Sequence, residues 1–312
     1  MSDKIIASIG TFDGVHRGHR FLLDQLRQLA RDNGDATVMA VTFDRHPLAL
    51  IAPERQPARL TPNDLKQRLL LEAGVDRVEI FEFDRQVKEM TAGEFMALLR
   101  DRYGVTRVLT GYDNSFGSDR PHGIEQYRHI APDGVTVDVG LPLIINDIPV
   151  SSTRIRRALS EGNLADANLM LGRPYRVSGT VTHGQHLGHR LGFPTANLQI
   201  PPHTQVPKNG VYAATATVDS KSYPAMVNIG LRPTVEPSTG LSAPTPTIEA
   251  HIIDFAGDIY GASLSLDFIA RLRDEQRFPS LDALTAQLNA DRRATLHCIE
   301  NWNLGLGISG KL

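Results

Sequence analysis

The 312-residue sequence has one cysteine, Cys298, one tryptophan and no long apolar run. A single cysteine allows neither an intrachain disulfide nor a Cys-x-x-Cys metal site. No stretch approaches the roughly 20 apolar residues that span a bilayer, and the N-terminus lacks the pattern of a secretory signal. Lys and Arg number 33 against 35 Asp and Glu. The sequence therefore has no excess of positive charge that would favour binding to nucleic acid or to an anionic membrane. We therefore expect a cytoplasmic protein without nucleic-acid or membrane partners, as a monomer or weak homo-oligomer.

Chain length and the pattern of apolar residues predict two domains of different fold. In the first half, strand-like runs such as 4–9 alternate with helical patterns such as 22–30, which is typical of an α/β domain with a parallel sheet. After Pro174, short β-type runs separated by Gly and Pro indicate a small barrel or sandwich, with closing helices at 281–288 and 294–302. We place the domains at 1–172 and 173–312.

The segment GTFDGVHRGH, residues 10–19, joins the first expected strand to the first expected helix. A Gly-rich turn at a helix N-terminus suits an anion because backbone N–H groups and the helix dipole converge there. His16 and His19 could donate hydrogen bonds to a phosphate whose charge grows in a transition state. A turn with two surface histidines is the plain alternative, and zinc binding lacks an evident third ligand.

A second candidate phosphate site is SSTRIR, residues 151–156. Ser and Thr cap helices, and Arg154 and Arg156 can each bind two phosphate oxygens. Taken alone, the pattern indicates an ordinary capped helix with solvated arginines. Within one α/β domain that also holds the two histidines, it favours a nucleotide site.

Together these motifs resemble the HxGH nucleotidyltransferase superfamily, which implies a Rossmann-like parallel sheet. GYDNSFG (111–117) and TFDRHP (42–47) are similar to segments of its flavin branch, although Asn114, Ser115 and Arg45 depart from the usual residues. The resemblance implies adenylyl transfer to FMN, with His16 and His19 as catalytic residues. It also implies that ATP is bound by Gly10, Phe12, Asp13, Gly14, Ser152, Thr153, Arg154 and Arg156, and flavin by Asp113 and Phe116.

The most specific string of the second half is GHRLGFPTANL, residues 188–198. Thr195 and Asn197 carry the hard oxygen atoms that Mg²⁺ prefers, so the string is either a Mg-nucleotide site or a generic turn. Glu249 lies in an apolar-flanked segment, as a surface residue or as a base for an attacking hydroxyl. His183, His186 and His189 recur every three residues of a Gly-rich segment, and we interpret them as surface residues rather than metal ligands.

The strings PTAN, NGVY, NIGLRPT, DIYG and LRDEQRF resemble those of the riboflavin kinase family and occur in its order. This resemblance implies a six-stranded β-barrel with a closing helix and Glu249 as the base. It implies that Thr195 and Asn197 bind Mg²⁺ and ATP, that Gly188 and Arg190 bind ATP, and that Arg273, Glu275 and Phe278 contact flavin. One departure is His189, which stands where the family usually has Arg.

The two resemblances cover nearly the whole chain, in the order of the bacterial bifunctional riboflavin kinase/FMN adenylyltransferase family. They imply Mg²⁺ as cofactor, with ATP, riboflavin, FMN and FAD as substrates and products. Two alternatives stay open. One is another nucleotidyltransferase, such as a cytidylyltransferase, with an unrelated β domain. The other is a flavin or nucleotide sensor without catalytic activity.

Overall fold

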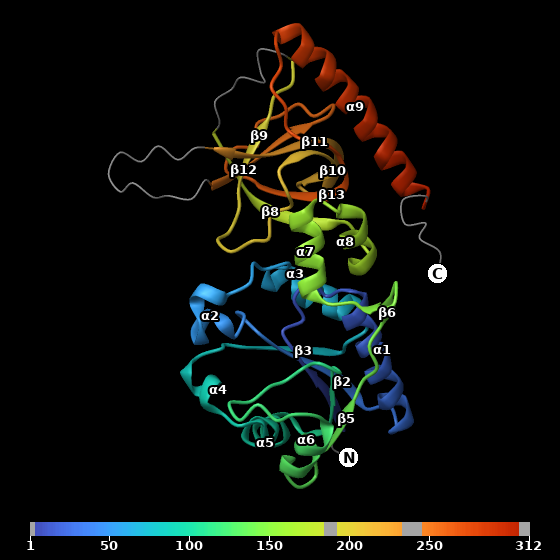
Figure 1. Ribbon diagram of the computed structural model, residues 1–312. Coiled ribbons are helices and arrows are strands. Elements are labelled where there is room, and N and C mark those ends of the chain that lie inside the picture. The colour runs from blue at the N-terminus through green and yellow to red at the C-terminus, as the bar shows by residue number, and fades with distance from the viewer. Residues whose placement is uncertain (1–3, 184–191, 233–244, 306–312) are drawn as a thin grey trace, which may run out of the picture. The chain divides into compact units, whose positions relative to one another are not determined.

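The computed structural model describes residues 4–183, 192–232 and 245–305, and the chain divides into two compact units, Met1–Ser152 and Thr153–Leu312 (Figure 1). Helices α7 (Ser152–Glu161) and α8 (Leu164–Leu171) therefore group with the second unit, apart from Ser152. Asn168 shows why for α8, since its side chain donates to Phe268 O and accepts from Tyr175 N, both in the barrel. The functional boundary expected after residue 172 stays a prediction.

The first unit is built on a five-stranded parallel sheet in the order β3-β2-β1-β4-β5. Its strands are β1 (Ile5–Ile9), β2 (Thr37–Phe43), β3 (Arg77–Phe81), β4 (Val105–Thr110) and β5 (Thr136–Val139). Ala7 of β1 faces both Met39 and Val108 in the parallel register. The Rossmann-like sheet is thus confirmed. Sequence analysis missed β5 because the strand has four residues and carries Asp138.

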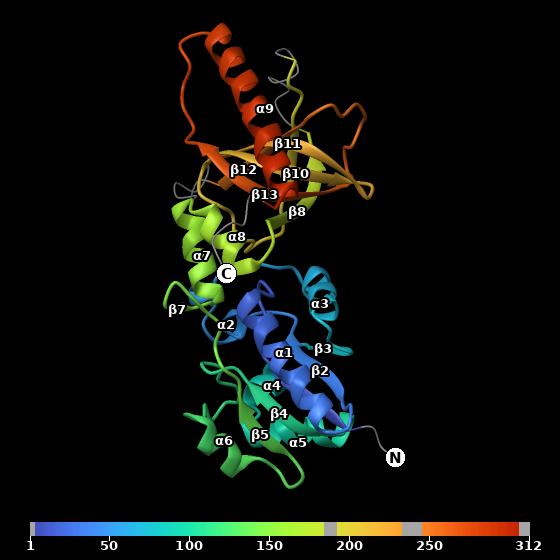
Figure 2. The same cartoon turned by 90° about the vertical axis from the view of Figure 1, so that its right-hand side faces the viewer.

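Helices cover both faces of this sheet (Figure 2). One face carries α1 (Arg17–Asp32) and α3 (Asn63–Glu72); the other carries α4 (Arg85–Glu89), α5 (Ala92–Tyr103) and α6 (Ile124–Ile130). Successive strand residues point to opposite faces, so Ile6 packs with Leu26 of α1, whereas Ala7 packs with Met96 of α5. Burial of both faces explains why the strands read as continuous apolar runs. Short elements complete the unit: α2 (Leu48–Ile51), η1 (Pro53–Arg55), β6 (Ile144–Ile145) and β7 (Ile148–Pro149).

The second unit is a closed barrel of six antiparallel strands in the order β10-β11-β12-β9-β8-β13. The strands are β8 (Tyr175–Thr182), β9 (Ala196–Gln199), β10 (Gly210–Val218), β11 (Lys221–Arg232), β12 (Thr245–Ile252) and β13 (Ser263–Arg273). Tyr212, Val227, Ala250 and Leu266 are fully buried. The six-stranded barrel expected from the sequence is therefore confirmed.

A single helix, α9 (Leu281–Asn303), packs on β10, β11 and β13 (Figure 1). The expectation of two helices, 281–288 and 294–302, is wrong, although the closing position is right. The 23-residue segment contains no Gly or Pro, and Asp291 near its middle is satisfied by hydrogen bonds from Arg273 and Gln287. Because these hydrogen bonds satisfy the buried carboxylate, Asp291 is accommodated in the middle of the helix and does not end it.

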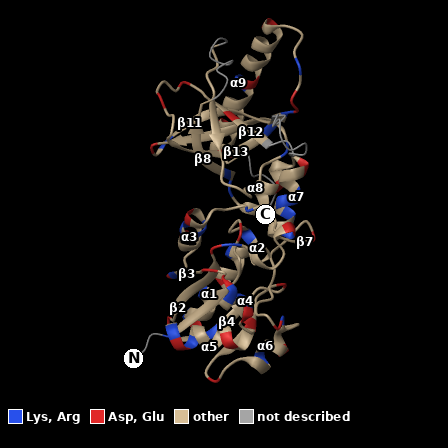
Figure 3. Ribbon diagram, turned by 90° about the vertical axis from the view of Figure 1, so that its left-hand side faces the viewer, with Lys and Arg blue, Asp and Glu red and all other residues tan. Residues whose placement is uncertain are grey.

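Charged residues of both signs occur along each unit (Figure 3). Many form exposed pairs, such as Arg85–Glu89 and Arg157–Glu161, which add little to stability. Within residues 4–183, 192–232 and 245–305, no helix has the length and apolar character needed to cross a membrane.

Candidate active sites

The turn between β1 and α1 holds an unusual backbone conformation. Phe12 and Val15 have φ angles of 46° and 39°, a region that costs a residue with a Cβ about 1 kcal/mol or more. A Cβ on Gly18 would lie 3.1 Å from His16 Nδ1, so a glycine keeps room for the histidine ring. The Phe12 ring packs edge-on against His19, with centroids 5.2 Å apart. Strain of this kind is characteristic of functional sites.

His16 and His19 form a stacked pair at the start of α1, with ring centroids 3.6 Å apart and planes 14° apart. His16 caps the helix, because its Nδ1 accepts a hydrogen bond from His19 N at 3.2 Å. Within the described part of the chain, His19 Nδ1 is buried without a hydrogen-bond partner. Burial, with smaller contributions from His16 and Lys66, lowers the pKa of His19 well below its usual range. A neutral, unsatisfied ring at this place points to a ligand.

Asp13 and Ser152, both predicted to bind ATP, hold neighbouring segments of backbone. The Asp13 carboxylate accepts from Leu60 N and Thr61 N, each at 3.0 Å. Ser152 Oγ donates to Asp13 O at 2.8 Å. These bonds fix the turn between β1 and α1.

The nucleotidyltransferase motifs contain further residues that are predicted to bind ATP, and those contacts stay predictions. Thr153, Arg154 and Arg156 lie on α7 in the second unit. Gly10 extends the sheet, since its N–H donates to Val41 O at 3.0 Å, and Gly14 takes a φ of 91°.

Lys66 is a buried cation below the turn that sequence analysis missed. It is 5% exposed, and its Nζ donates to Phe43 O at 2.6 Å, Thr42 Oγ1 at 3.1 Å and Thr11 O at 3.4 Å. Burial lowers the pKa of Lys66 to about 8. The available signal was its place on the apolar stripe of α3, four residues before the buried Leu70.

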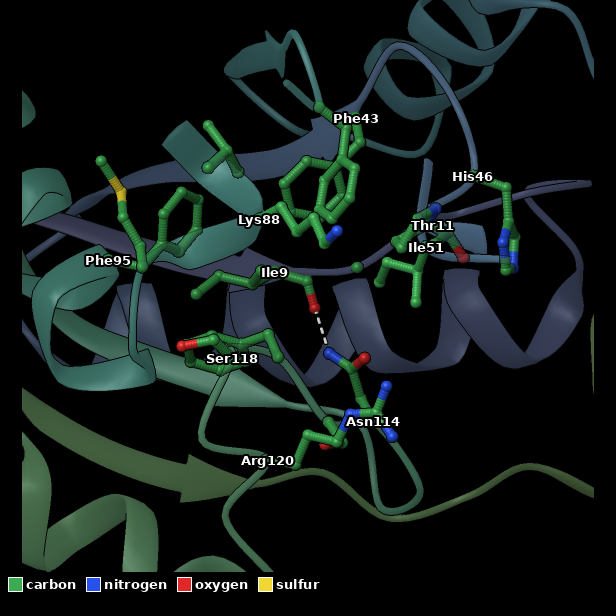
Figure 4. Close-up of a pocket in the computed structure, with 18 of the residues that line it drawn as sticks. Ile9, Thr11, Phe43, His46, Ile51, Lys88, Phe95, Asn114, Ser118 and Arg120 are labelled. Carbon is green, nitrogen blue, oxygen red and sulfur yellow. Dashed lines mark hydrogen bonds between the residues drawn. The ribbon is translucent and has the colours of Figure 1, made fainter. Parts of the chain in front are cut away.

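A mostly apolar pocket of about 550 Å³ lies at the carboxyl end of the sheet (Figure 4). The strand order reverses between β1 and β4, which is where open α/β sheets bind ligands. Aromatic side chains suit it to a planar ring system, and its volume suits a small-molecule ligand. Its apolar lining includes Ile9, Phe43, Ile51, Phe83, Val87, Met90, Phe95 and Phe116, and its polar lining includes Thr11, His46, Lys88, Asn114, Ser118 and Arg120.

Of the two predicted flavin residues, Phe116 lines this pocket, whereas Asp113 is absent from its lining. The Phe116 ring packs on Tyr127, whose hydroxyl accepts from Phe116 N at 2.8 Å. Asn114, a departure from the family pattern, donates from Nδ2 to Ile9 O and so joins the loop after β4 to the end of β1 (Figure 4). Flavin contacts of Asp113 and Phe116 stay predictions.

On the barrel, Asn228, Glu249 and Asn197 form a row across β11, β12 and β9, because Glu249 is the register partner of both asparagines. Partners in antiparallel strands project from the same face. Ile248 and Ala250, which flank Glu249, are buried, so the row belongs to the outer face of the barrel. The fold thus brings together two of the predicted kinase residues. Asn228, the third member, was part of a family string but had no predicted role.

Thr195 lies immediately before β9 and lines a cavity of about 280 Å³ together with Pro194, Ala250, Phe255 and Tyr260. The side chains of Thr195 and Asn197 offer hard oxygen donors that fit Mg²⁺. The described part of the chain has no group of three or more His, Cys, Asp and Glu able to hold a metal. This set fits an ion that arrives with a nucleotide, because Mg²⁺ commonly takes one or two protein ligands and completes its shell with water and phosphate oxygens.

The first four residues of the string GHRLGFPTANL, 188–191, lie outside the described ranges, and they include Gly188, Arg190 and the departure His189. Their predicted roles are therefore untested. His183 is described, and its ring stacks on Tyr260 with centroids 4.0 Å apart.

The predicted flavin residues of the barrel begin with Arg273, the last residue of β13, and continue into the segment after it. Asn228 Nδ2 donates to Glu275 Oε1 at 3.1 Å, which links this segment to the row that holds Glu249. Arg273 is anchored to α9, with its Nη2 2.7 Å from Asp291 Oδ2, and its guanidinium lies 5.7 Å from the Phe278 ring centroid. Flavin contacts of Arg273, Glu275 and Phe278 stay predictions.

Comparisons with known proteins match the two units. A family described as FAD synthetase matches residues 1–154, and one described as riboflavin kinase matches residues 171–299. A bifunctional riboflavin kinase/FMN adenylyltransferase from Pseudomonas fluorescens is 39% identical over 290 residues, which are 92% of this chain and 90% of that protein. The Bacillus subtilis protein of the same description is 29% identical over 303 residues, which are 96% of this chain and 93% of that protein.

A solved structure described as a macrolide-efflux protein from Streptococcus pneumoniae has a TM-score of 0.83 at 30% identity, and the match covers 95% of this chain and 94% of that one. The efflux description has no counterpart in the two family matches. An α/β unit of the FAD synthetase family joined to a riboflavin kinase barrel defines the class as two-domain flavin nucleotide transferases. The chain belongs to the bifunctional riboflavin kinase/FMN adenylyltransferase family.

Proposed function

We propose that this chain makes FAD from riboflavin in two ATP-dependent steps, one on each unit. The barrel phosphorylates riboflavin to FMN, and the α/β unit transfers AMP from ATP to FMN with release of pyrophosphate. Family membership across nearly the whole chain supports both steps. The observation that carries the assignment is that Glu249 and Asn197 are register partners on the barrel, in a chain that also keeps the stacked histidine pair of the α/β unit.

In the barrel, Glu249 takes the proton of the ribityl 5′-hydroxyl as its oxygen attacks the γ-phosphorus of ATP, and ADP leaves. Thr195 and Asn197 are the residues that would hold Mg²⁺, whose chemistry when bound is to offset phosphate charge. Gly188 and Arg190 contact the ATP phosphates. The flavin lies against Arg273, Glu275 and Phe278.

In the α/β unit, a phosphate oxygen of FMN attacks the α-phosphorus of ATP, and the bond to the β-phosphate breaks. This nucleophile is already an anion, so no general base is required. His16 and His19 donate hydrogen bonds to the charge that develops on the transferring phosphate. The apolar pocket that Phe116 lines holds the flavin ring, and Asp113 contacts the flavin outside this lining. ATP is further bound by Gly10, Phe12, Asp13, Gly14, Ser152, Thr153, Arg154 and Arg156.

Some wider features belong to the same proposal. The functional domains are 1–172 and 173–312, which assigns α7 and α8 to adenylyl transfer. The protein acts in the cytoplasm as a monomer or weak homo-oligomer, and it has no nucleic-acid or membrane partner.

A direct test separates riboflavin, FMN and FAD after incubation of the protein with riboflavin, ATP and Mg²⁺. FMN followed by FAD is the expected result. FMN alone contradicts the α/β assignment, and conversion of added FMN without use of riboflavin contradicts the barrel assignment. Use of CTP in place of ATP would favour another nucleotidyltransferase, and tight flavin binding without product would favour a sensor.

A further inference from the structure

Two residues after Glu249, β12 carries a histidine whose contacts the reaction above does not use. His251 Nδ1 lies 2.8 Å from Pro194 O, the carbonyl immediately before Thr195. Strand residues two apart point to the same face, so His251 and Glu249 share the outer face of the barrel. The antiparallel register of β12 and β9 pairs Glu249 with Asn197 and Ala250 with Ala196. Continued by one residue, it sets Thr195 opposite His251.

The hydrogen bond decides which ring nitrogen of His251 carries the proton. A carbonyl oxygen can only accept, so Nδ1 is the donor. Burial lowers the pKa of His251, and Arg292 adds to this effect, although the hydrogen bond to Pro194 and the charge of Asp254 act in the opposite direction. Arg292 is itself paired with Asp254 at 2.8 Å. The neutral ring therefore keeps its one N–H on the Pro194 carbonyl.

Packing holds the ring in this orientation. Phe193 meets it edge-on, with centroids 5.1 Å apart and planes at 64°. Phe193 is buried in a small cluster with Met226, Ile253 and Leu288, and Met226 is the register partner of His251 on β11. The hydrogen bond thus joins two segments that a hydrophobic cluster already holds together.

We propose that His251 is a positioning residue of the kinase site, whose Nδ1–H fixes the peptide plane between Pro194 and Thr195. The carbonyl of Pro194 and the N–H of Thr195 belong to one rigid plane. A bond to the carbonyl oxygen therefore restricts the backbone of Thr195 and the direction of its hydroxyl. Each of the two predicted Mg-ATP residues then lies opposite one residue of β12. Asn197 lies opposite Glu249, and Thr195 lies opposite His251, whose hydrogen bond holds the carbonyl before Thr195. This inference rests on the proposed kinase function.

The test compares H251L, H251Q and H251N with the wild type. Leu keeps apolar volume against Phe193 without a donor, Gln places its amide near the Nε2 position, and Asn places its N–H near the Nδ1 position. In conversion of riboflavin to FMN, we expect H251L and H251Q to raise the KM for Mg-ATP about tenfold, as for loss of one well-placed hydrogen bond. The KM for riboflavin should be unchanged. H251N should stay within about threefold of the wild type, and FMN adenylylation should be unchanged in all three.

Amide hydrogen exchange supplies a readout that does not depend on activity. A peptide covering residues 193–199 should exchange faster in H251L and H251Q than in the wild type and H251N. Equal KM values in all four proteins, or a defect in H251N as large as in H251Q, would overturn the inference. The inference would also be overturned if residues 193–199 of H251Q exchanged at the wild-type rate. H251Q provides this test even if H251L fails to fold. If the wild type itself makes no FMN, the kinase assignment fails, while the exchange comparison still tests the placement of Thr195.

Discussion

The rings of His16 and His19 lie face to face at the start of α1, with centroids 3.6 Å apart. The Nδ1 atom of His16 accepts the hydrogen bond that caps the helix. The Nδ1 atom of His19 is buried and has no hydrogen-bond partner among the described residues. In the proposed reaction both rings contact the transferring phosphate, and His16 also caps the helix through its Nδ1.

Replacement of His19 by Ala should lower the rate of FAD formation from FMN by about 100-fold or more, since it removes a donor to developing phosphate charge. FMN formation from riboflavin should be unchanged, because that site lies in the other unit. Initial rates with each substrate check both statements. His129→Ala, at an exposed position of α6, is the matched control and should leave both rates unchanged.

The lowered pKa of His19 predicts acid sensitivity of the α/β unit. Below a pH of about 6.5 an unfolded chain protonates this imidazole, whereas the folded unit resists protonation. The free energy of unfolding should therefore fall as the pH drops below that value. Urea midpoints at pH 5 and pH 7, followed by circular dichroism, should differ less in His19→Asn than in the wild type. An equal difference in both proteins would place the acid sensitivity elsewhere.

The lowered pKa of Lys66 predicts a pH dependence of the same sign in the alkaline range. Its pKa is lowered to about 8 in the folded unit, so between pH 8 and pH 10 the unfolded chain binds more protons than the folded one. The free energy of unfolding should rise across this range, by roughly 3 kcal/mol at most. Lys66→Met should remove the rise, and Lys88→Met, at an exposed position of the same unit, should keep it. Denaturant titrations at several pH values measure both slopes.

Glu249→Gln should reduce FMN formation by about 100-fold or more, because the amide keeps the shape of the carboxylate but cannot take the hydroxyl proton. Conversion of added FMN to FAD should continue at the wild-type rate. Glu300→Gln, on an exposed part of α9, controls for loss of charge. A Glu249→Gln protein that still makes FMN at the wild-type rate would show that another group accepts the proton.

Asp291→Asn should destabilise the barrel by about 3–5 kcal/mol, because Arg273 would lose its buried charge partner. The Asp291 side chain is 4% exposed, and its pair with Arg273 is supported by a further bond from Gln287. Arg85→Gln breaks a pair whose side chains are 88% and 63% exposed and should change stability by less than about 1 kcal/mol. Urea unfolding of both variants tests the contrast. Similar losses would mean that burial does not set the strength of these pairs.

Local sequence patterns predicted most of the elements that build the two sites. The strand Ile5–Ile9 lies within the apolar run 4–9 that indicated it, and the Gly-rich turn with His16 and His19 does join a strand to a helix. The pattern failed where elements are short or polar. The strand β9, Ala196–Gln199, is too short for periodicity and is defined by its pairing with β12 and β8.

Residues whose roles depend on contacts with distant parts of the chain were harder to predict from the sequence. Nothing local predicts that the Asp13 carboxylate meets the N–H groups of Leu60 and Thr61, because that contact exists only after the sheet has formed. The hydrogen-bond partners of Lys66 could not be predicted for the same reason. Its acceptors, Thr11 O, Thr42 Oγ1 and Phe43 O, come from two other segments.

The row of Asn228, Glu249 and Asn197 exists because these residues occupy strand positions that face the outside of the barrel. Removal of one residue from β12 ahead of Glu249, with pairing otherwise kept, would turn the carboxylate toward the packed interior and turn an apolar neighbour outward. Removal of two residues would restore the side but shift the carboxylate along the strand, away from Asn197. In the proposed mechanism, phosphoryl transfer therefore requires the correct register of β12 as well as the correct residues, and we expect kinase activity to be lost when that register shifts.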